Sequence, residues 1–212
     1  MVSNLVIKDK DEPDYSVVGT RPVRHDGADK VTGRARYAAD AQPPGLLHAK
    51  MLRSPHAHAK LLSVDMSRAL EHPRGIEALT GAEAYPLAGP MPVYSYREAA
   101  AIKKPDYRCL AHDRVRFVGE PVALVAAADR YSADDVAELV DVAYEPLEPL
   151  MDPEDSLKAG AQKLHDNLDN NVGLRIERRG GDMEAAYREA DFVFKKRYRM
   201  HRHAGTPIET RG

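Results

Sequence analysis

The sequence predicts an α/β (α+β) fold built from short strand–helix–strand units. The run of residues 121–128 (PVALVAAA) is continuously apolar and is bounded by turn-forming residues, which is typical of a strand buried on both faces. The order strand, short helix, strand occurs twice, in residues 46–80 and again in residues 121–146. Because parallel strands require a crossover connection, two such units favour a small α/β sheet.

The first unit opens with two strands. Residues 46–53 are short and apolar enough for one strand, and residues 60–66 (KLLSVDM) repeat the signal. In the second strand, Leu62, Val64 and Met66 alternate with other residues. We therefore expect these three side chains on one face.

A short helix, SRALEH, connects these strands to a third one. Ser67 is expected to be its N-cap, because a serine hydroxyl can accept a hydrogen bond from a first-turn amide. Pro73 and Gly75 end the helix, and residues 75–80 (GIEALT) are expected to form the third strand.

The second unit follows the apolar run. Ser132 and Asp135 form an S-x-x-D capping pattern ahead of a helix. The apolar side of this helix is expected to consist of Val136, Leu139 and Val140. The sequence DVAYEPLEP then predicts a strand that Pro146 ends.

Three features lie outside the two units. Residues 85–107 are rich in proline and show no period, so they predict a long loop, and such loops are often functional. Asp182 is expected to cap the helix MEAAYREA. Residues 192–203 alternate and predict a strand with one buried side. That side would carry Phe192, Phe194, Tyr198 and Met200.

Composition excludes several classes of protein. Lysine and arginine number 31 and aspartate and glutamate 33, giving a formal charge of −2, whereas a nucleic-acid-binding protein usually carries a large positive field. The longest apolar run is far shorter than the roughly 20 residues of a membrane span. The N-terminus shows no secretory signal. We therefore expect no nucleic acid partner, no membrane insertion and a cytoplasmic location.

Three patterns suggest chemistry, but each has a simpler explanation. His56-x-His58 and His201-x-His203 could each present two imidazoles, yet no further ligands complete a zinc site, so solvated histidines are favoured. The cluster KKRYRMHRH mixes basic and aromatic residues as nucleic-acid patches do, but its aromatic residues alternate away from most of the charges. The single Cys109 lies near a histidine, but adjacency alone does not position a base, and a structural cysteine is favoured.

Two carboxylates stand next to expected strands. Glu120 directly precedes the apolar run, and Glu209 follows the expected strand of residues 192–203. Because carboxylates at strand ends often line sites in α/β sheets, Glu120 and Glu209 are candidates for a substrate channel or for the layer behind it. A solvated role is the alternative for both residues.

Five segments together resemble a known family. They are, in order, KVTGRARYAAD, LLHAKMLRSPHAHAKLLSVD, RVRFVGEPVALVAA, LVDVAYEPLEPLMDPEDSL and GDMEAAYREADFVFKKRYRMHRHAGTPIETRG. In this order they are similar to the N-terminal part of the molybdopterin-binding large subunit of the xanthine dehydrogenase, aldehyde oxidase and aerobic carbon monoxide dehydrogenase family. The resemblance covers about residues 17–212.

The resemblance implies a fold and a division of the chain. It implies a flexible arm over residues 1–18, an α/β hammerhead domain over 19–150, and a connector with the first elements of the molybdopterin-binding domain over 151–212. The family's catalytic and cofactor-binding motifs are absent from this sequence. We therefore assign no catalytic, cofactor-binding or metal-binding residue.

The resemblance also implies an activity and partners. It implies a segment of an oxidoreductase that oxidises an aldehyde, an N-heterocycle or carbon monoxide with water as the oxygen source. The molybdenum–pterin cofactor, in its cytosine dinucleotide form, would be bound mainly by the remainder of the subunit or by a second chain. A small subunit with [2Fe–2S] clusters and a medium subunit with FAD would complete a dimer of heterotrimers. The alternative is a free-standing, non-catalytic hammerhead module that binds a partner protein.

Overall fold

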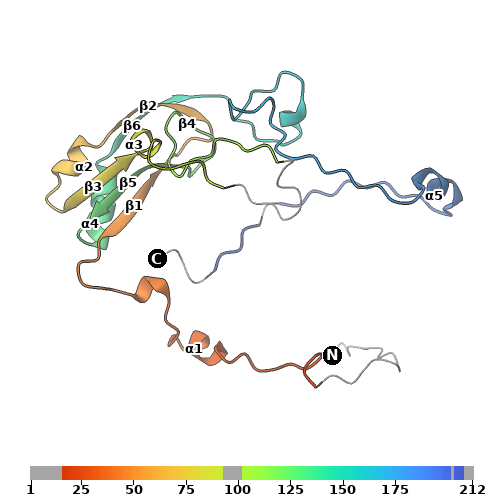
Figure 1. The fold of residues 1–212 in the computed structure, drawn as a ribbon, viewed down its shortest axis with the longest axis horizontal. Coiled ribbons are helices and arrows are strands. Elements are labelled where there is room, and N and C mark those ends of the chain that lie inside the picture. The colour runs from red at the N-terminus through yellow and green to blue at the C-terminus, as the bar shows by residue number, and fades with distance from the viewer. Residues whose placement is uncertain (1–15, 93–101, 202, 208–212) are drawn as a thin grey trace. The chain divides into compact units, whose positions relative to one another are not determined.

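The computed structural model describes residues 16–92, 102–201 and 203–207, drawn as coloured ribbon in Figure 1. The chain divides into two units by its internal contacts. One unit comprises the chain up to Pro43 together with the chain from Arg199, and the other is Pro44–Tyr198. The expected arm over residues 1–18 lies mostly outside the described residues, and its character stays a prediction.

The first unit has only short elements among its described residues. These are α1 (Gly27–Val31) and the 3₁₀ helix η1 (Ala38–Asp40), and neither contains a buried residue. Asp26 accepts hydrogen bonds from Arg24 and pairs with Lys30, and both contacts lower the pKa of its carboxyl to about 2. The stretch is therefore held by local polar contacts and lacks a core.

The second unit contains two three-stranded sheets. One has the order β1 (His48–Arg53), β5 (Pro121–Ala127), β3 (Gly75–Thr80), and the other has the order β4 (Arg114–Val115), β2 (Ala59–Asp65), β6 (Asp141–Pro146). Every pairing among these strands is antiparallel. The mixed α/β class is confirmed, but the expectation of crossover-linked parallel strands is wrong.

The reason for the difference lies in where the helices take the chain. The helix α2 (Ser67–Glu71) connects β2 to β3, and α4 (Arg130–Glu138) connects β5 to β6. In each strand–helix–strand unit, the two strands that the helix connects belong to different sheets. Each strand–helix–strand unit therefore exists as expected, but its helix carries the chain from one sheet to the other.

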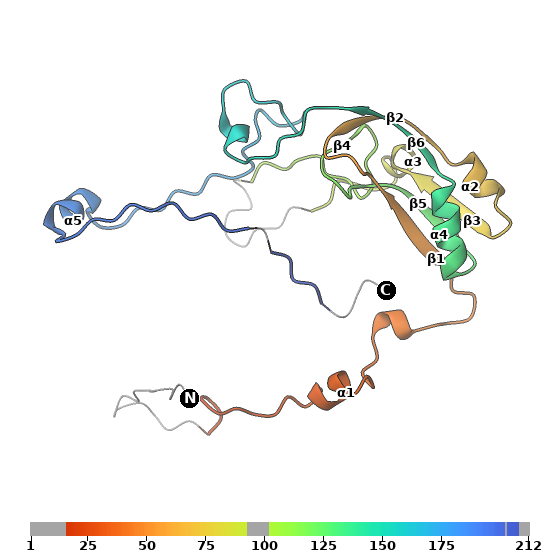
Figure 2. The same ribbon diagram turned by 180° about the vertical axis from the view of Figure 1, so that it is seen from behind.

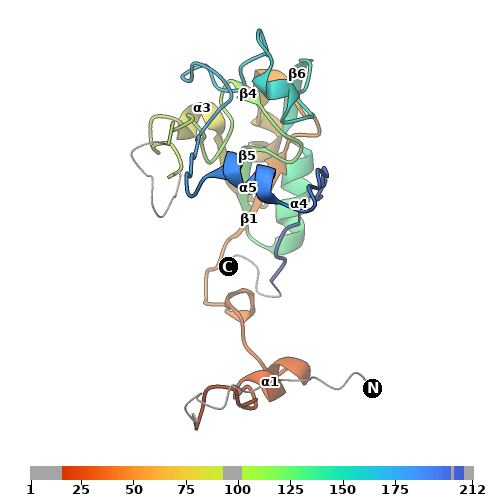
Figure 3. The same cartoon turned by 90° about the vertical axis from the view of Figure 1, so that its right-hand side faces the viewer.

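The larger core lies between the helices and the β1–β5–β3 sheet. Figures 1 and 2 show α4 along this sheet, and in Figure 3 α4 stands beside β1 and β5. On β5, Ala123, Val125 and Ala127 are fully buried, while Leu124 and Ala126 on the opposite face are half-buried. Small side chains on the buried face let the helices approach closely. The apolar side predicted for α4 is confirmed, since Val136, Leu139 and Val140 belong to this core.

A smaller core lies between the two sheets. Its buried members are Ala59, Ala111, Val115 and Val122. Leu52 and Val142 pack against both cores. The two sheets are therefore connected by shared apolar side chains as well as by the helices.

The expected face of β2 is wrong at one residue. Leu61 pairs with Tyr144 and Ser63 with Ala143, so Leu62 is an extra residue in the ladder. This bulge turns Leu62 outward, where it is 61% exposed, whereas Leu61 packs on the smaller core. The alternation predicted over residues 60–66 breaks at this bulge.

Both helix starts differ from the sequence prediction. Asp129 is the N-cap of α4, and its carboxylate accepts hydrogen bonds from the Ser132 amide at 3.0 Å and the Ser132 hydroxyl at 2.7 Å. The contacts with Ser132 and Arg74 hold the pKa of Asp129 well below its usual range. Similarly, Ser67 is the first residue of α2, and its amide and hydroxyl donate to Asp65. In both places a carboxylate takes the accepting role that was expected of serine.

The C-terminal part of the described chain, from Asp182 onward, is only partly as predicted. The helix α5 (Met183–Glu189) forms, and its cap is confirmed because Asp182 accepts from the Ala185 amide at 3.0 Å. Residues 192–201 contain no strand, and Glu209 lies outside the described residues. The side chains predicted to be buried are exposed: Phe192, Phe194, Tyr198 and Met200. A lone strand lacks hydrogen-bonding partners, so no strand forms where no neighbouring strand pairs with this segment.

The backbone at Gly81 lies so close to residues 111–112 that no side chain fits there. This residue opens α3 (Gly81–Ala84), a short helix that the sequence analysis did not predict, with Thr80 and Glu83 forming its capping box. A Cβ atom added at Gly81 would lie 1.8 Å from the carbonyl oxygen of Ala111. Gly89 lies in the same region, and a Cβ atom there would meet nothing within 4 Å.

We predict that Gly81→Ala lowers the free energy of unfolding by about 1–3 kcal/mol or more, because the backbone of residues 111–112 must move. Gly89→Ala is the matched control and should change stability by less than about 0.5 kcal/mol. Urea denaturation of both variants checks this. Equal stabilities for the two variants would contradict the close approach of α3 to residues 111–112.

Candidate functional site

The buried carboxylate of Glu120 closes a turn between the two sheets. Glu120 is only 2% exposed, and its carboxylate accepts a hydrogen bond from the backbone amide of Arg116. Its own amide donates to the Phe117 carbonyl at 3.2 Å. Gly119 completes the turn with a φ of +87°, in the left-handed region that favours glycine. The motif RFVGE therefore encodes a turn that is folded around its last residue.

Burial also determines the electrostatics of this turn. It raises the pKa of the Glu120 carboxyl, and the opposing hydrogen bonds from the Arg116 and Phe117 amides and the Arg116 charge do not cancel the rise. A carboxyl of this kind could hold a proton, but its oxygens face backbone amides. The geometry supports a role for Glu120 in shaping the turn, and its place in a substrate channel stays a prediction.

The guanidinium of Arg116 connects two segments, residues 113–116 and Leu164. It donates to the Arg114 carbonyl at 3.0 Å, to the Asp113 carboxylate at 3.3 Å, and to the carbonyl of Leu164 at 2.7 Å. Its side chain is only 11% exposed. The sequence analysis missed this residue. The alternation RVRF, which places two arginines on one side of a strand, is the signal that could have found it.

The tip of the turn presents apolar side chains. Phe117 and Val118 are exposed, and the Phe117 ring lies 6.2 Å from the ring of Tyr107. The base of the turn is fixed to the end of β1, since Arg53 donates to the Gly119 carbonyl at 2.8 Å and the Gly119 amide donates to the Ser54 carbonyl at 2.8 Å. A rigid base therefore supports an exposed apolar tip.

The histidines of the pair His56 and His58 were expected to be solvated, and this is wrong for His58, which is 2% exposed. The Nδ1 atom of His58 lies 2.9 Å from the Glu148 carbonyl, so it must donate, and neutral His58 keeps a bare Nε2 that is buried without a partner. The His56 ring instead packs against Tyr144, at 4.8 Å. The described ranges contain no group of three histidine, cysteine or acidic residues that could hold a metal ion. His201 and His203 are exposed.

The described ends of the expected loop carry an aromatic and cationic cluster. The Tyr85 ring lies 4.2 Å from the His112 ring, and the Arg108 guanidinium lies 4.1 Å above the Tyr85 ring. Arg108 also donates to the Ala88 carbonyl at 2.7 Å. These contacts fix the ends of the loop, while residues 93–101 lie outside the described chain. Cys109, expected as a structural cysteine, is exposed.

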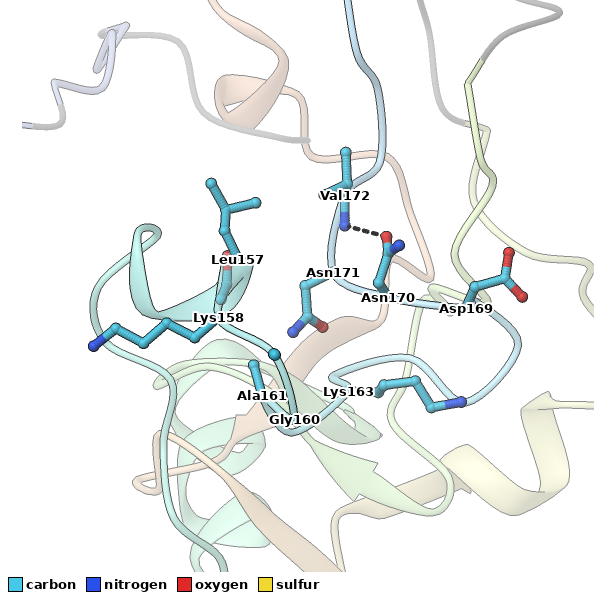
Figure 4. Close-up of a pocket in the computed structure, with 11 residues that line it drawn as sticks. Leu157, Lys158, Gly160, Ala161, Lys163, Asp169, Asn170, Asn171 and Val172 are labelled. Atoms are coloured by element: carbon cyan, nitrogen blue, oxygen red, sulfur yellow. Dashed lines mark hydrogen bonds between the residues drawn. The ribbon is translucent and has the colours of Figure 1, made fainter.

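Residues 156–172 line a partly open cavity of about 470 Å³ (Figure 4). Asn171 closes the loop around it, since its amide accepts from the Leu164 amide and donates to the Gln162 carbonyl, both at 2.9 Å. Asn170 accepts from the Val172 amide at 3.0 Å, as the dashed line in Figure 4 shows. These asparagines are used by the backbone, so the cavity provides no catalytic pair.

We predict that Glu120→Ala lowers the free energy of unfolding by about 1–3 kcal/mol, because it leaves a buried amide of the turn without an acceptor. Glu120→Gln is the matched variant: it keeps an acceptor oxygen and should lose less than half as much. Chemical denaturation of both proteins at neutral pH measures the difference. Losses of equal size would show that the carboxylate charge, rather than its accepting oxygen, holds the turn.

Comparison with known proteins identifies the family. Residues 32–148 match the family model described as "Aldehyde oxidase and xanthine dehydrogenase, a/b hammerhead domain". The nicotine 6-hydroxylase large subunit of Paenarthrobacter nicotinovorans is 39% identical, over 93% of this chain and 24% of that protein. Subunit gamma of the 6-hydroxypseudooxynicotine dehydrogenase complex of the same organism is 36% identical, over 92% of this chain and 24% of that protein.

A solved structure agrees with these relatives. Quinoline 2-oxidoreductase from Pseudomonas putida 86 superposes with a TM-score of 0.71 at 33% identity, over 82% of this chain and 22% of that one. The chain thus spans about a quarter of the length of the relatives that it matches. The hammerhead fold inferred from the resemblance is confirmed, and since the family model covers more than half of its length, the chain belongs to the aldehyde oxidase and xanthine dehydrogenase family.

Proposed function

We propose that this chain is the N-terminal segment of the large subunit of a molybdenum hydroxylase, where it forms part of the wall of the substrate channel and docks partner subunits. The enzyme would oxidise an aldehyde, an N-heterocycle or carbon monoxide with water as the oxygen source. One relative is a nicotinate dehydrogenase large molybdopterin subunit, and one structural neighbour is a Cu,Mo-CO dehydrogenase. The family resemblance implies iron–sulfur and FAD partners. The assignment of this reaction to the present chain is our inference from them.

The observation that carries the proposal is the uncovered apolar surface around α5. The residues Met183, Ala186, Tyr187, Ala190, Phe192, Val193 and Phe194 line an apolar hollow of about 230 Å³. Phe192 is 79% exposed and Phe194 is 85% exposed. Contiguous apolar surface of this kind is typical of an interface. In a protein that spans a quarter of its relatives' length, the remainder of the large subunit is the natural cover.

The described residues do not fit the family's cofactors. A [2Fe–2S] cluster is held by four cysteines, and this chain has one, Cys109. None of the residues that line the cavity of residues 156–172 is buried, so the cavity offers no buried set of donors for a pterin. We therefore derive no chemical step through these groups. In the proposed enzyme the molybdenum–pterin cofactor, in its cytosine dinucleotide form, is bound by the rest of the large subunit.

The role of this segment in such an enzyme is positional. The turn around Glu120 holds Phe117 and Val118 outward on a base that is fixed to β1. An apolar tip on a rigid base suits a channel wall, because a metal centre of this class needs a shaped, dry cavity. Small and medium subunits with [2Fe–2S] and FAD, in a dimer of heterotrimers, complete the proposal.

The proposal also includes a cellular location and an alternative function. None of the helices in the described ranges combines the length and apolarity that crossing a bilayer demands. We propose a cytoplasmic enzyme. The alternative, a free-standing module that binds a partner protein, would also use the exposed Phe192 and Phe194, so the metal content of the native complex distinguishes the two functions.

We predict that the native complex containing this sequence carries near-stoichiometric molybdenum and about four iron atoms per copy, the count for two [2Fe–2S] clusters. Elemental mass spectrometry of the purified complex, with intact masses of its subunits, measures this. A clean and folded 212-residue species without either metal would overturn the proposal and leave the binding module.

We further predict that Phe194→Asp prevents assembly of that complex while leaving the melting temperature of the isolated chain unchanged, because Phe194 is exposed in the chain alone. Tyr131→Asp, on α4, is the matched control, since Tyr131 is 83% exposed but lies away from the hollow. Size-exclusion chromatography of the co-expressed subunits reports assembly. Normal assembly of the Phe194 variant would show that the hollow is not the docking surface.

A further inference from the structure

Residues 162–173, which we call the strap, lie along residues 103–116. At one end of the strap, the Lys103 amide donates to the Gly173 carbonyl at 2.9 Å. In the middle, Asn167 accepts from the Asp106 amide at 3.2 Å and donates to the Lys104 carbonyl at 2.9 Å. These bonds connect residues about 60 positions apart in the sequence, so they hold the strap in place as a tertiary contact.

Two arginines hold the other end of the strap. Arg114 donates to the Asp166 carboxylate at 2.9 Å, and Arg116 donates to the Leu164 carbonyl at 2.7 Å. Both arginines come from the edge of β4 and the turn that follows it. The strap is therefore connected directly to the turn that Glu120 closes.

The strap is held mainly by polar contacts, and its apolar residues Leu164, Leu168 and Val172 are only half-buried. No residue of 151–201 is fully buried, and neither apolar core contains a residue beyond Tyr144. Segments attached by exposed hydrogen bonds open at a smaller free-energy cost than segments that contribute to a core. The strap can thus detach while both sheets and their cores stay folded.

One histidine stands between the two arginine contacts. His165 follows Leu164 and precedes Asp166, and its Nδ1 atom is buried without a hydrogen-bond partner. The charged groups that face it are Arg116, Asp106, Asp113 and Asp166. The three carboxylates are already paired, with Arg108, Arg116 and Arg114 respectively.

A proton on His165 would place a second positive charge next to the Arg116 guanidinium and so weaken the contact between Arg116 and the strap. Arg116 is committed to Asp113 and to the Arg114 carbonyl, so it cannot move away from a new cation without breaking contacts. Burial and the Arg116 charge lower the pKa of His165, against the smaller opposing effect of the carboxylates. The held strap thus favours neutral His165.

We propose that the strap is a pH-sensitive clasp, which stays on residues 103–116 while His165 is neutral and is released when His165 takes up a proton. The two arginine contacts, the unpartnered imidazole nitrogen between them and the lack of core residues in the strap carry the proposal. It stands independently of the redox function proposed above.

The direction of the pH effect follows from linkage. In the released strap, His165 titrates at its ordinary pKa of 6.5, and in the held strap it titrates lower. The released state therefore binds the proton more tightly. The equilibrium constant for release should rise as the pH falls below about 6.5, by up to about tenfold per pH unit. The rise should end once the pH passes below the pKa of the held state.

Amide hydrogen exchange of the full chain tests the clasp. The Lys103 and Asp106 amides report on it, because both donate to the strap, and the Val125 amide in β5 is the internal reference. Exchange is measured by NMR from about pH 7.5 to about pH 5.5 and is corrected for the intrinsic pH dependence of exchange. Protection of the two reporters should fall by up to about tenfold per pH unit while protection of Val125 stays constant.

A substitution separates His165 from the other histidines. His165→Gln keeps a neutral polar side chain that does not titrate, so reporter protection should become independent of pH in this range. His25→Gln removes an exposed histidine in the other unit and should retain the wild-type pH response. A pH-independent wild type, or a pH response that persists in His165→Gln, overturns the proposal.

One outcome needs a second readout. If His165→Gln loses protection at every pH, the wild-type imidazole resonance of His165 decides. A midpoint below those of the exposed histidines, together with the loss of reporter protection over the same pH range, supports the clasp. A midpoint at the ordinary value of a solvated histidine overturns it.

Discussion

Arg116 connects the parts of the second unit that the two cores leave unattached. Its amide donates to the buried carboxylate of Glu120, which closes the turn, and its guanidinium donates to Asp113 and Leu164. A guanidinium presents five donors in a fixed plane, so one side chain can fix several carbonyl and carboxylate groups at once. Charge and burial act together here, because the side chain is nearly covered and its hydrogen bonds are shielded from water. The turn and the strap therefore meet at one residue that contributes nothing to an apolar core.

The arrangement of the sheets explains why polar contacts attach so many segments of the second unit. Three-stranded antiparallel sheets can bury one face and leave the other partly wet, and here the two helices cover only the β1–β5–β3 sheet. In the smaller core, Leu61 and Tyr144 of the second sheet pack together with Leu52 and Val122 of the first. Beyond Tyr144 the described chain has no apolar layer to join, so it is attached by side-chain hydrogen bonds and ion pairs. The stability of the molecule is thus concentrated in residues 48–146.

The sequence allowed the local elements to be predicted better than their partners. Strands over residues 48–53, 75–80, 121–127 and 141–146 and the caps of α5 follow from short-range chemistry, which is written in adjacent residues. The antiparallel pairing, the bulge at Leu62 and the choice of Asp129 over Ser132 as a cap are determined by contacts between distant segments. At the site, Glu120 could be selected because a carboxylate beside an apolar run is unusual. Arg116 was missed because its partner, Leu164, is 48 residues away and offers only a backbone carbonyl.

The exposed hollow around α5 and the hydrogen-bonded strap share one property: neither segment contributes a residue to an apolar core. Phe192 and Phe194 belong to neither core, and both line the apolar hollow. An exposed hollow of this kind is suited to contact with another surface. We propose that the strap is attached reversibly to this chain, whereas the hollow is suited to burial against another surface. Under the function proposed above, the segment around α5 would connect the hammerhead domain to the remainder of a large subunit, because the chain spans about a quarter of its relatives' length.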